Sequence, residues 1–69
     1  MPTVELNGER VTLPEGATAA DAARAAGAVA DTRGVALALD GEVLPRGTWQ
    51  ATALREGGRV EVLHAVQGG

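Results

Sequence analysis

An Asn-Gly pair between two short alternating segments is the feature that most restricts how this chain can fold. Residues 3–6 and 9–13 each alternate polar and apolar side chains, and Asn7-Gly8 separates them. Both residues of such a pair tolerate the positive φ angles of a two-residue turn, so the pattern predicts a β-hairpin. The period of two places the apolar side chains of each segment on one face, which must be covered by the rest of the chain.

A single short helix is predicted next. Thr18 is suited to the N-cap position, and Asp21 stands three residues later in a variant of the capping box. Residues 19–26 are nearly all alanine, and Gly27 follows where a helix end favours positive φ. The apolar stripe has only methyl side chains, so we expect this helix to lie close against a sheet.

The second half of the chain predicts three more strands. The fold class that follows is α+β. Later strands would complete the hairpin into a mixed sheet of four to five strands, with one helix packed across it. This is the β-grasp (ubiquitin-like) arrangement. The predicted segments, in order, are a central strand at 35–39, a turn at Asp40-Gly41, a short strand at 42–44 ended by Pro45, an irregular segment at 46–52 with a short helical turn around Trp49, a turn at 54–58, a strand at 59–63 and a tail at 64–69.

Size and charge exclude several classes of function. The 69 residues form one domain, with a net charge of −3 and no cluster among the six arginines, which argues against nucleic-acid binding. No apolar stretch approaches the length of a membrane span, so we expect a cytoplasmic protein. With no cysteine and one histidine, we expect neither a metal site nor a nucleophile, and therefore no enzyme.

The chemistry is expected at the C-terminus, where the sequence reads Val66-Gln67-Gly68-Gly69. An enzyme that activates a terminal carboxylate must draw it through a narrow channel, and only residues without Cβ can follow an unrestricted backbone path there. The alternative interpretation is a frayed chain end without function. A β-grasp domain (residues 1–63) followed by a flexible tail (residues 64–69) that ends in Gly-Gly resembles the ubiquitin-like and sulfur-carrier proteins.

Four segments sharpen the resemblance to the sulfur-carrier proteins of thiamine biosynthesis. Val-Glu-Leu-Asn-Gly (4–8) is similar to the family's opening hairpin. Val-Ala-Leu-Ala-Leu-Asp-Gly-Glu-Val-Leu-Pro-Arg-Gly-Thr-Trp (35–49) is similar to its middle segment, and residues 54–63 and the Val-Gln-Gly-Gly end complete the match. The family often has Asn at the position of Asp40, Gly-Asp at Gly57-Gly58, and leucines in the helix.

The resemblance implies both a topology and a mechanism. The last strand would lie in mid-sheet, parallel to the first. An E1-like adenylating enzyme would bind ATP-Mg and convert the Gly69 carboxylate to an acyl-adenylate. Sulfur from a persulfide, supplied by a cysteine desulfurase, would then give a thiocarboxylate for thiazole synthase to use. This chain would be a carrier that binds no cofactor, and its partners would hold the catalytic groups.

A docking surface is predicted beside the tail. If alternate residues of the strands face the helix, then Ala36, Ala38 and Leu63 face outward and form a flat apolar patch, which with the tail residues Val66, Gln67 and Gly68 would bind the partners. The alternative is that these are singly exposed apolar residues without a role. Trp49 is expected to be a packing residue and His64 an exposed one, while Arg46 suits either a partner contact or a loop cap.

Three other functions remain open at this stage. The chain could carry sulfur for another pathway, such as molybdopterin, cysteine or transfer-RNA thiolation, because the tail chemistry would be the same. It could be a ubiquitin-like modifier, joined through Gly69 to a lysine of another protein. It could also be an interaction domain with an inert tail, in which case removal of Gly68-Gly69 would leave its function intact.

Overall fold

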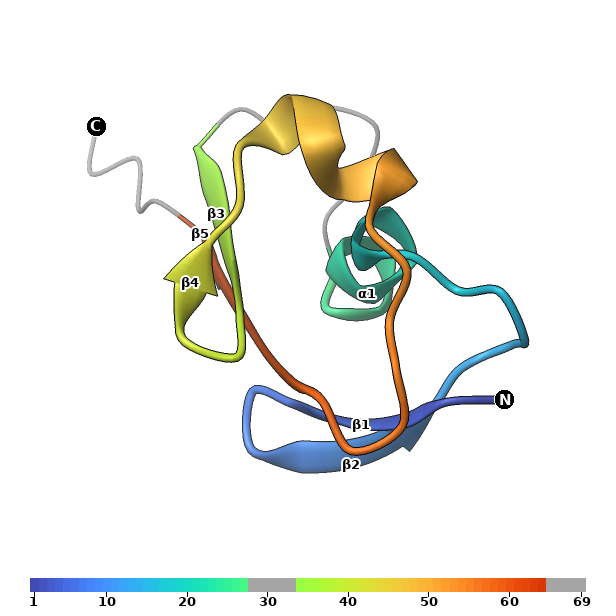
Figure 1. The fold of residues 1–69 in the computed structure, drawn as a ribbon. Helices are drawn as coiled ribbons and strands as arrows, with labels where there is room; N and C mark the ends of the chain where they lie inside the picture. Colours follow the sequence, from blue (N-terminus) through green and yellow to red (C-terminus); the bar gives the residue numbers. More distant parts are fainter. Residues whose placement is uncertain (28–33, 65–69) are drawn as a thin grey trace.

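A five-stranded sheet with one α-helix across it forms the body of the protein (Figure 1). The structure, a computed structural model, describes residues 1–27 and 34–64. The elements are β1 (Thr3–Leu6), β2 (Glu9–Thr12), α1 (Ala19–Ala25), β3 (Val35–Leu39), β4 (Glu42–Val43), the 3₁₀ helix η1 (Arg46–Ala51) and β5 (Arg59–His64).

The predicted hairpin is confirmed. β1 and β2 pair antiparallel, with Leu6 opposite Glu9 at the turn. Asn7 and Gly8 have φ angles of 51° and 88°, as a type I′ turn requires. This register places Val4 and Leu6 in the core, where their exposed fractions are 1% and 5%.

The strand order is β2-β1-β5-β3-β4, so the last strand lies in the middle of the sheet. β5 is parallel to β1 and antiparallel to β3. This is the topology that the family resemblance implied, and the β-grasp fold is confirmed. β4 is shorter than the predicted 42–44, because Leu44 leaves the strand, although its N–H still donates to the carbonyl of Leu37 (2.9 Å).

The helix begins and ends close to the predicted positions. The N–H of Thr18 donates to the Asp21 carboxylate (2.8 Å), and this hydrogen bond, with the Arg24 guanidinium beside it, lowers the pKa of Asp21 below its usual value. The helix ends one residue early, at Ala25, with Ala26 as its C-cap. Gly27 follows with a φ of 100°, so the predicted C′ glycine is confirmed.

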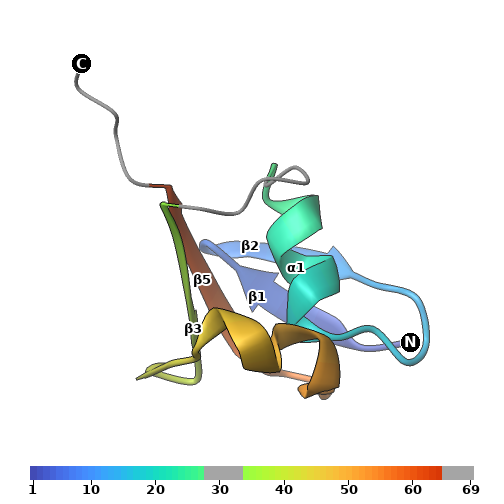
Figure 2. The same ribbon diagram turned by 90° about the horizontal axis from the view of Figure 1, so that it is seen from above.

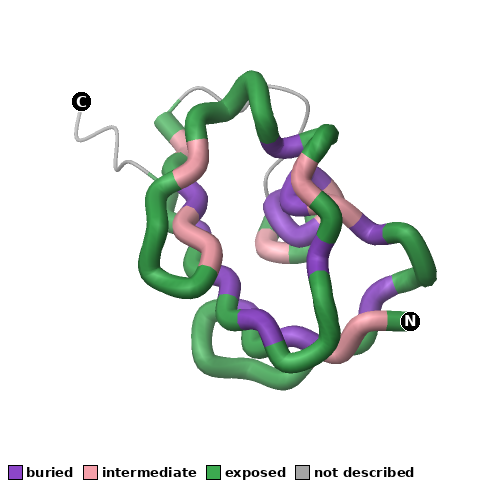
Figure 3. The backbone as a smooth tube through the Cα atoms, in the orientation of Figure 1, coloured by how far each residue is buried: buried purple, intermediate pink, exposed green. Residues whose placement is uncertain are grey.

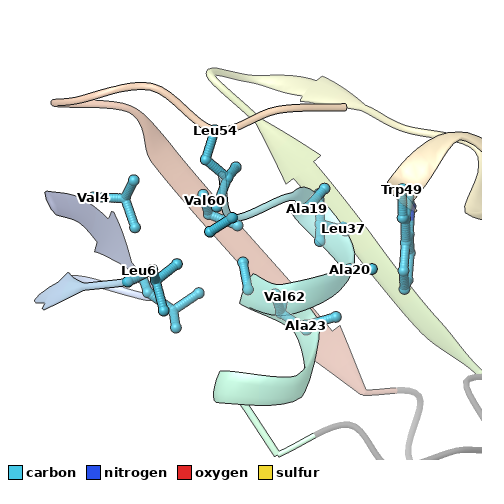
Figure 4. Packing of buried hydrophobic residues seen from close by; sticks show 13 residues of the cluster. Val4, Leu6, Ala19, Ala20, Ala23, Leu37, Trp49, Leu54, Val60 and Val62 are labelled. Atoms are coloured by element: carbon cyan, nitrogen blue, oxygen red, sulfur yellow. The ribbon is translucent and has the colours of Figure 1, made fainter. Parts of the chain in front are cut away.

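The core lies between the sheet and α1, with η1 beside the helix (Figures 2 and 4). Leu37 and Val60 from the sheet and Ala19 and Ala22 from the helix are completely buried. Because the helix contributes only methyl groups, its axis can approach the sheet closely, and each of its residues adds little burial energy. From Arg59 to Leu63, exposed and buried positions alternate along β5 (Figure 3).

Trp49, the single aromatic residue, closes one end of this core. Its side chain is 3% exposed, and its indole N–H donates to the carbonyl of Leu44 (3.0 Å). The predicted packing role is confirmed, as is the helical turn around it, which is the 3₁₀ helix η1. Within residues 1–27 and 34–64, no helix has the length and apolar composition needed to cross a membrane.

Candidate functional site

The candidate site begins where β5 ends. His64, which the sequence pattern assigned to the tail, is the last residue of β5 and pairs with Val35, so the strand is one residue longer than predicted. The period of two along β5 expects an apolar residue at position 64, and the polar His64 made the strand seem to end at Leu63. In the structure, both side chains are exposed. The tail residues Val66, Gln67, Gly68 and Gly69 lie outside the described residues, so their predicted roles stay predictions.

An apolar patch lies on the sheet face that points away from α1, beside the end of β5. Ala36 is directly opposite Leu63 on the neighbouring strand, and Ala38 is opposite Val43. Leu63 and Val43 are 69% and 68% exposed, Ala36 is exposed and Ala38 is half-buried. We call these four residues the outer apolar patch. The predicted outward placement of Ala36, Ala38 and Leu63 is confirmed, whereas their role in docking stays a prediction.

Val43 is a patch residue that the sequence analysis missed. A strand of two residues has no alternation from which its facing can be predicted, and only the pairing of Val43 with Ala38 reveals the face on which it lies. Large exposed side chains such as Val43 and Leu63 add far more apolar area than the two alanines do. The patch is therefore larger than the sequence indicated.

The other half of the same sheet face is polar. Glu5 lies opposite Arg10 on β2 and pairs with Arg59 on β5 (3.4 Å). All three side chains are exposed, so the ion pair adds little stability. The outer face is thus charged over β1–β2 and apolar over β3–β4. Between them, β5 presents Arg59 and then Glu61, which lies opposite Ala38, and its last outward residue is the apolar Leu63.

Two turns attach β5 to its neighbours by side-chain hydrogen bonds. The Asn7 carboxamide accepts a hydrogen bond from the N–H of Val62 (2.8 Å) and donates one to the carbonyl of Val62 (3.2 Å). The Asp40 carboxylate accepts one from the N–H of Arg59 (2.9 Å), which with Arg55 nearby lowers the pKa of Asp40. Sequence analysis missed both contacts, because partners 55 and 19 residues apart leave no local pattern.

Few other side chains in the described part of the chain are candidates for a catalytic or binding role. In residues 1–27 and 34–64, no three His, Asp or Glu side chains gather to hold a metal ion. Arg46 is exposed at the first residue of η1, a position that leaves its predicted alternatives open. The site therefore consists of the end of β5, the outer apolar patch and the tail that follows in the sequence.

Comparisons with known proteins identify the family and support the fold. The model of the ThiS family matches residues 2–69. Among solved structures, the chain is similar to a thiamine biosynthesis protein (ThiS) from Geobacter metallireducens, with 30% sequence identity and a TM-score of 0.72 over 97% of this chain and 99% of that chain. No curated protein sequence gives a significant match. Because the family match covers nearly the whole chain, from the opening hairpin to Gly69, the chain belongs to the ThiS family of small sulfur-carrier proteins.

Proposed function

We propose that this chain carries sulfur for thiazole formation in thiamine biosynthesis, on the carboxylate of Gly69. The observation that carries the proposal is the extent of the family match, which includes Gly68-Gly69 as well as the folded domain. The similar solved structure is described as a thiamine biosynthesis protein, and it supports this pathway over the other sulfur-carrying ones. The sheet adds a physical reason, since the tail follows β5, a central strand that pairs with β1 at its start and with β3 as far as His64.

The proposed reaction begins with activation. An E1-like adenylating enzyme binds this chain together with ATP-Mg, and an oxygen of the Gly69 carboxylate attacks the α-phosphorus. The products are an acyl-adenylate and pyrophosphate. A carboxylate is a poor electrophile because it is ionised at neutral pH, and adenylation supplies a good leaving group.

Sulfur transfer follows. A persulfide sulfur, derived from a cysteine desulfurase, attacks the acyl carbon and displaces AMP, and a thiol then cleaves the remaining sulfur–sulfur bond to leave a thiocarboxylate on Gly69. Thiazole synthase takes the sulfur into its product, and an oxygen atom from its substrate or from water replaces the sulfur and restores the carboxylate. In this scheme the chain is a cosubstrate that binds no cofactor of its own and acts in the cytoplasm.

Intact-mass measurement tests the proposal. The protein is incubated with the adenylating enzyme of the same organism, ATP-Mg, a cysteine desulfurase, cysteine and a thiol reductant. We expect replacement of one oxygen by sulfur, located at Gly69 by fragmentation, and transfer of that sulfur when thiazole synthase and its substrates are added. A mass that does not change under conditions in which a known carrier is converted would refute the sulfur-carrier role. Conversion without transfer to thiazole synthase would refute the pathway.

The outer apolar patch is the proposed docking surface, and Leu63→Asp tests it. A charge at this 69% exposed position adds a desolvation cost to any apolar contact, so we expect kcat/KM for adenylation to fall by about 10–100-fold. Thr12→Asp is the matched control, because it places the same charge on the polar half of the same face. Equal adenylation of the two folded variants would show that the patch does not dock.

A further inference from the structure

Two turns of the sheet have the same design and hold β5 at different points. Asn7-Gly8 joins β1 to β2, and Asp40-Gly41 joins β3 to β4. Asn7 and Asp40 both have a φ of 51°, and the glycine after each has a φ of 88°. Both side chains leave their turn to bond the backbone of β5. The Asp40 contact lies at the first residue of that strand, whereas the Asn7 contact lies two residues before its end.

The Asn7 carboxamide continues the parallel pairing of β1 with β5 after β1 has ended. The backbone N–H of Asn7 donates to the carbonyl of Val60 (2.9 Å), which is the last bond of this ladder made by the main chain of β1 and its turn. The side chain then binds both the N–H and the carbonyl of Val62. A single amide thereby supplies the acceptor and the donor that the next peptide groups of a longer strand would have supplied.

The Asn7 contact determines how the end of β5 is held in the sheet. On its β3 side, β5 stays paired as far as His64, which is opposite Val35. On its β1 side, the Asn7 carboxamide makes the last hydrogen bonds that join β5 to the described part of the chain. Without them, the final residues of β5 would be held from one side only, as in an edge strand.

We propose that Asn7 is a positioning residue for the reaction at Gly69: its carboxamide fixes the direction in which the chain leaves the sheet. This inference rests on the proposed function. Gly69 is seven residues beyond Val62, so release of the end of β5 at Val62 adds residues that must be ordered before the carboxylate can react. The entropy of ordering each further residue lowers a rate by roughly 5- to 30-fold.

The expected kinetic signature is specific to this role. Ala36, Ala38 and Val43 belong to β3 and β4, and Leu63 stays paired with β3, so the outer apolar patch stays in place when the Asn7 contact is lost. Docking should then be nearly unchanged, while fewer docked complexes present the carboxylate to ATP. Loss of the carboxamide should therefore lower kcat for adenylation more than it raises KM.

Asn7→Gly and Asp40→Gly form a matched pair. Each gives a Gly-Gly turn that keeps the positive φ, each adds one glycine to the unfolded chain, and each removes a side-chain contact with β5. Pyrophosphate-exchange kinetics with the adenylating enzyme are measured for both variants and the wild type, with the folded fraction obtained from urea unfolding. We expect kcat to fall about 5–20-fold for Asn7→Gly, with KM within about 2-fold of wild type, and both constants to be near wild type for Asp40→Gly. Asn7→Asp keeps the acceptor for Val62 but loses the donor, and should give an intermediate kcat.

The outcomes separate this inference from the proposed function. Equal kcat values for Asn7→Gly and Asp40→Gly would overturn the positioning role. An Asn7→Gly variant whose KM rises while its kcat stays at the wild-type value would overturn it as well. In either case the wild-type protein would still be adenylated, and the proposed function would stand. Amide hydrogen exchange provides a readout without the enzyme: Val62 should lose protection in Asn7→Gly and keep it in Asp40→Gly, and unchanged protection of Val62 in Asn7→Gly would overturn the inference as well.

Discussion

Deletion of Gly69 is expected to abolish thiocarboxylate formation while leaving the domain folded. The shortened chain would end in Gly68, so its terminal group would still be a glycine carboxylate of the same chemistry. What changes is its reach, by about 3.5 Å, the length of one extended residue. Because proximity supplies a large part of the acceleration of a transfer reaction, we expect the rate of adenylation to fall by at least about 1,000-fold.

Intact mass and pyrophosphate exchange measure this loss, and circular dichroism with urea unfolding checks that the domain is unaffected. Gly68→Ala is the companion variant, since it keeps the length of the chain and adds one Cβ in the proposed narrow channel. We expect an intermediate rate for it. A chain that lacks Gly69 and yet gains sulfur at the wild-type rate would contradict the proposed carrier site.

Replacement of Trp49 by alanine is expected to have the largest effect on stability. The side chain is 3% exposed, and its loss would leave a cavity at the end of the core beside η1. Truncation of a buried aromatic side chain costs about 3–5 kcal/mol, which is a large share of the 5–15 kcal/mol that usually separates folded from unfolded domains. In a domain whose helix contributes only methyl groups to the core, we expect Trp49→Ala to be largely unfolded at 37 °C.

Thermal and urea unfolding followed by circular dichroism test this prediction, because the variant has no aromatic residue for fluorescence. Trp49→Phe is the control that keeps a ring in the core but removes the hydrogen bond to the Leu44 carbonyl. The free energy of unfolding of Trp49→Phe should fall by about 1–2 kcal/mol, and this variant should stay folded. If Trp49→Ala were as stable as Trp49→Phe, the packing role assigned to the indole ring would be wrong.

Local chemistry explains which parts of the fold could be predicted from the sequence. The Asn7-Gly8 turn and the helix between Thr18 and Gly27 were predicted because each depends on residues a few positions apart. The position of β5 in the middle of the sheet depends on pairing between strands more than fifty residues apart, for which periodicity contains no information. Only the family resemblance supplied it.

The same limit explains what was missed at the candidate site. The outward facing of Leu63 followed from the alternation of β5, but His64 was placed in the tail because it is polar at a position where the alternation expects an apolar residue. Val43 belongs to a strand too short to show a period. The Asn7 carboxamide was interpreted only through the backbone turn it favours, and its contact with Val62 requires the folded sheet.

The position of β5 also affects how this protein can be made in a cell. β1–β2 and β3–β4 are the outer pairs of strands, and β5 is the last strand in chain order, yet it is the one that joins them. A growing chain on the ribosome therefore holds two separate hairpins, each marginal alone, until its C-terminal segment emerges. Any truncated product that stops before Arg59 lacks the centre of the sheet. We expect quality-control proteases to remove such fragments, so that the proposed partner enzymes encounter only chains synthesised at least as far as the strand that precedes the proposed carrier site.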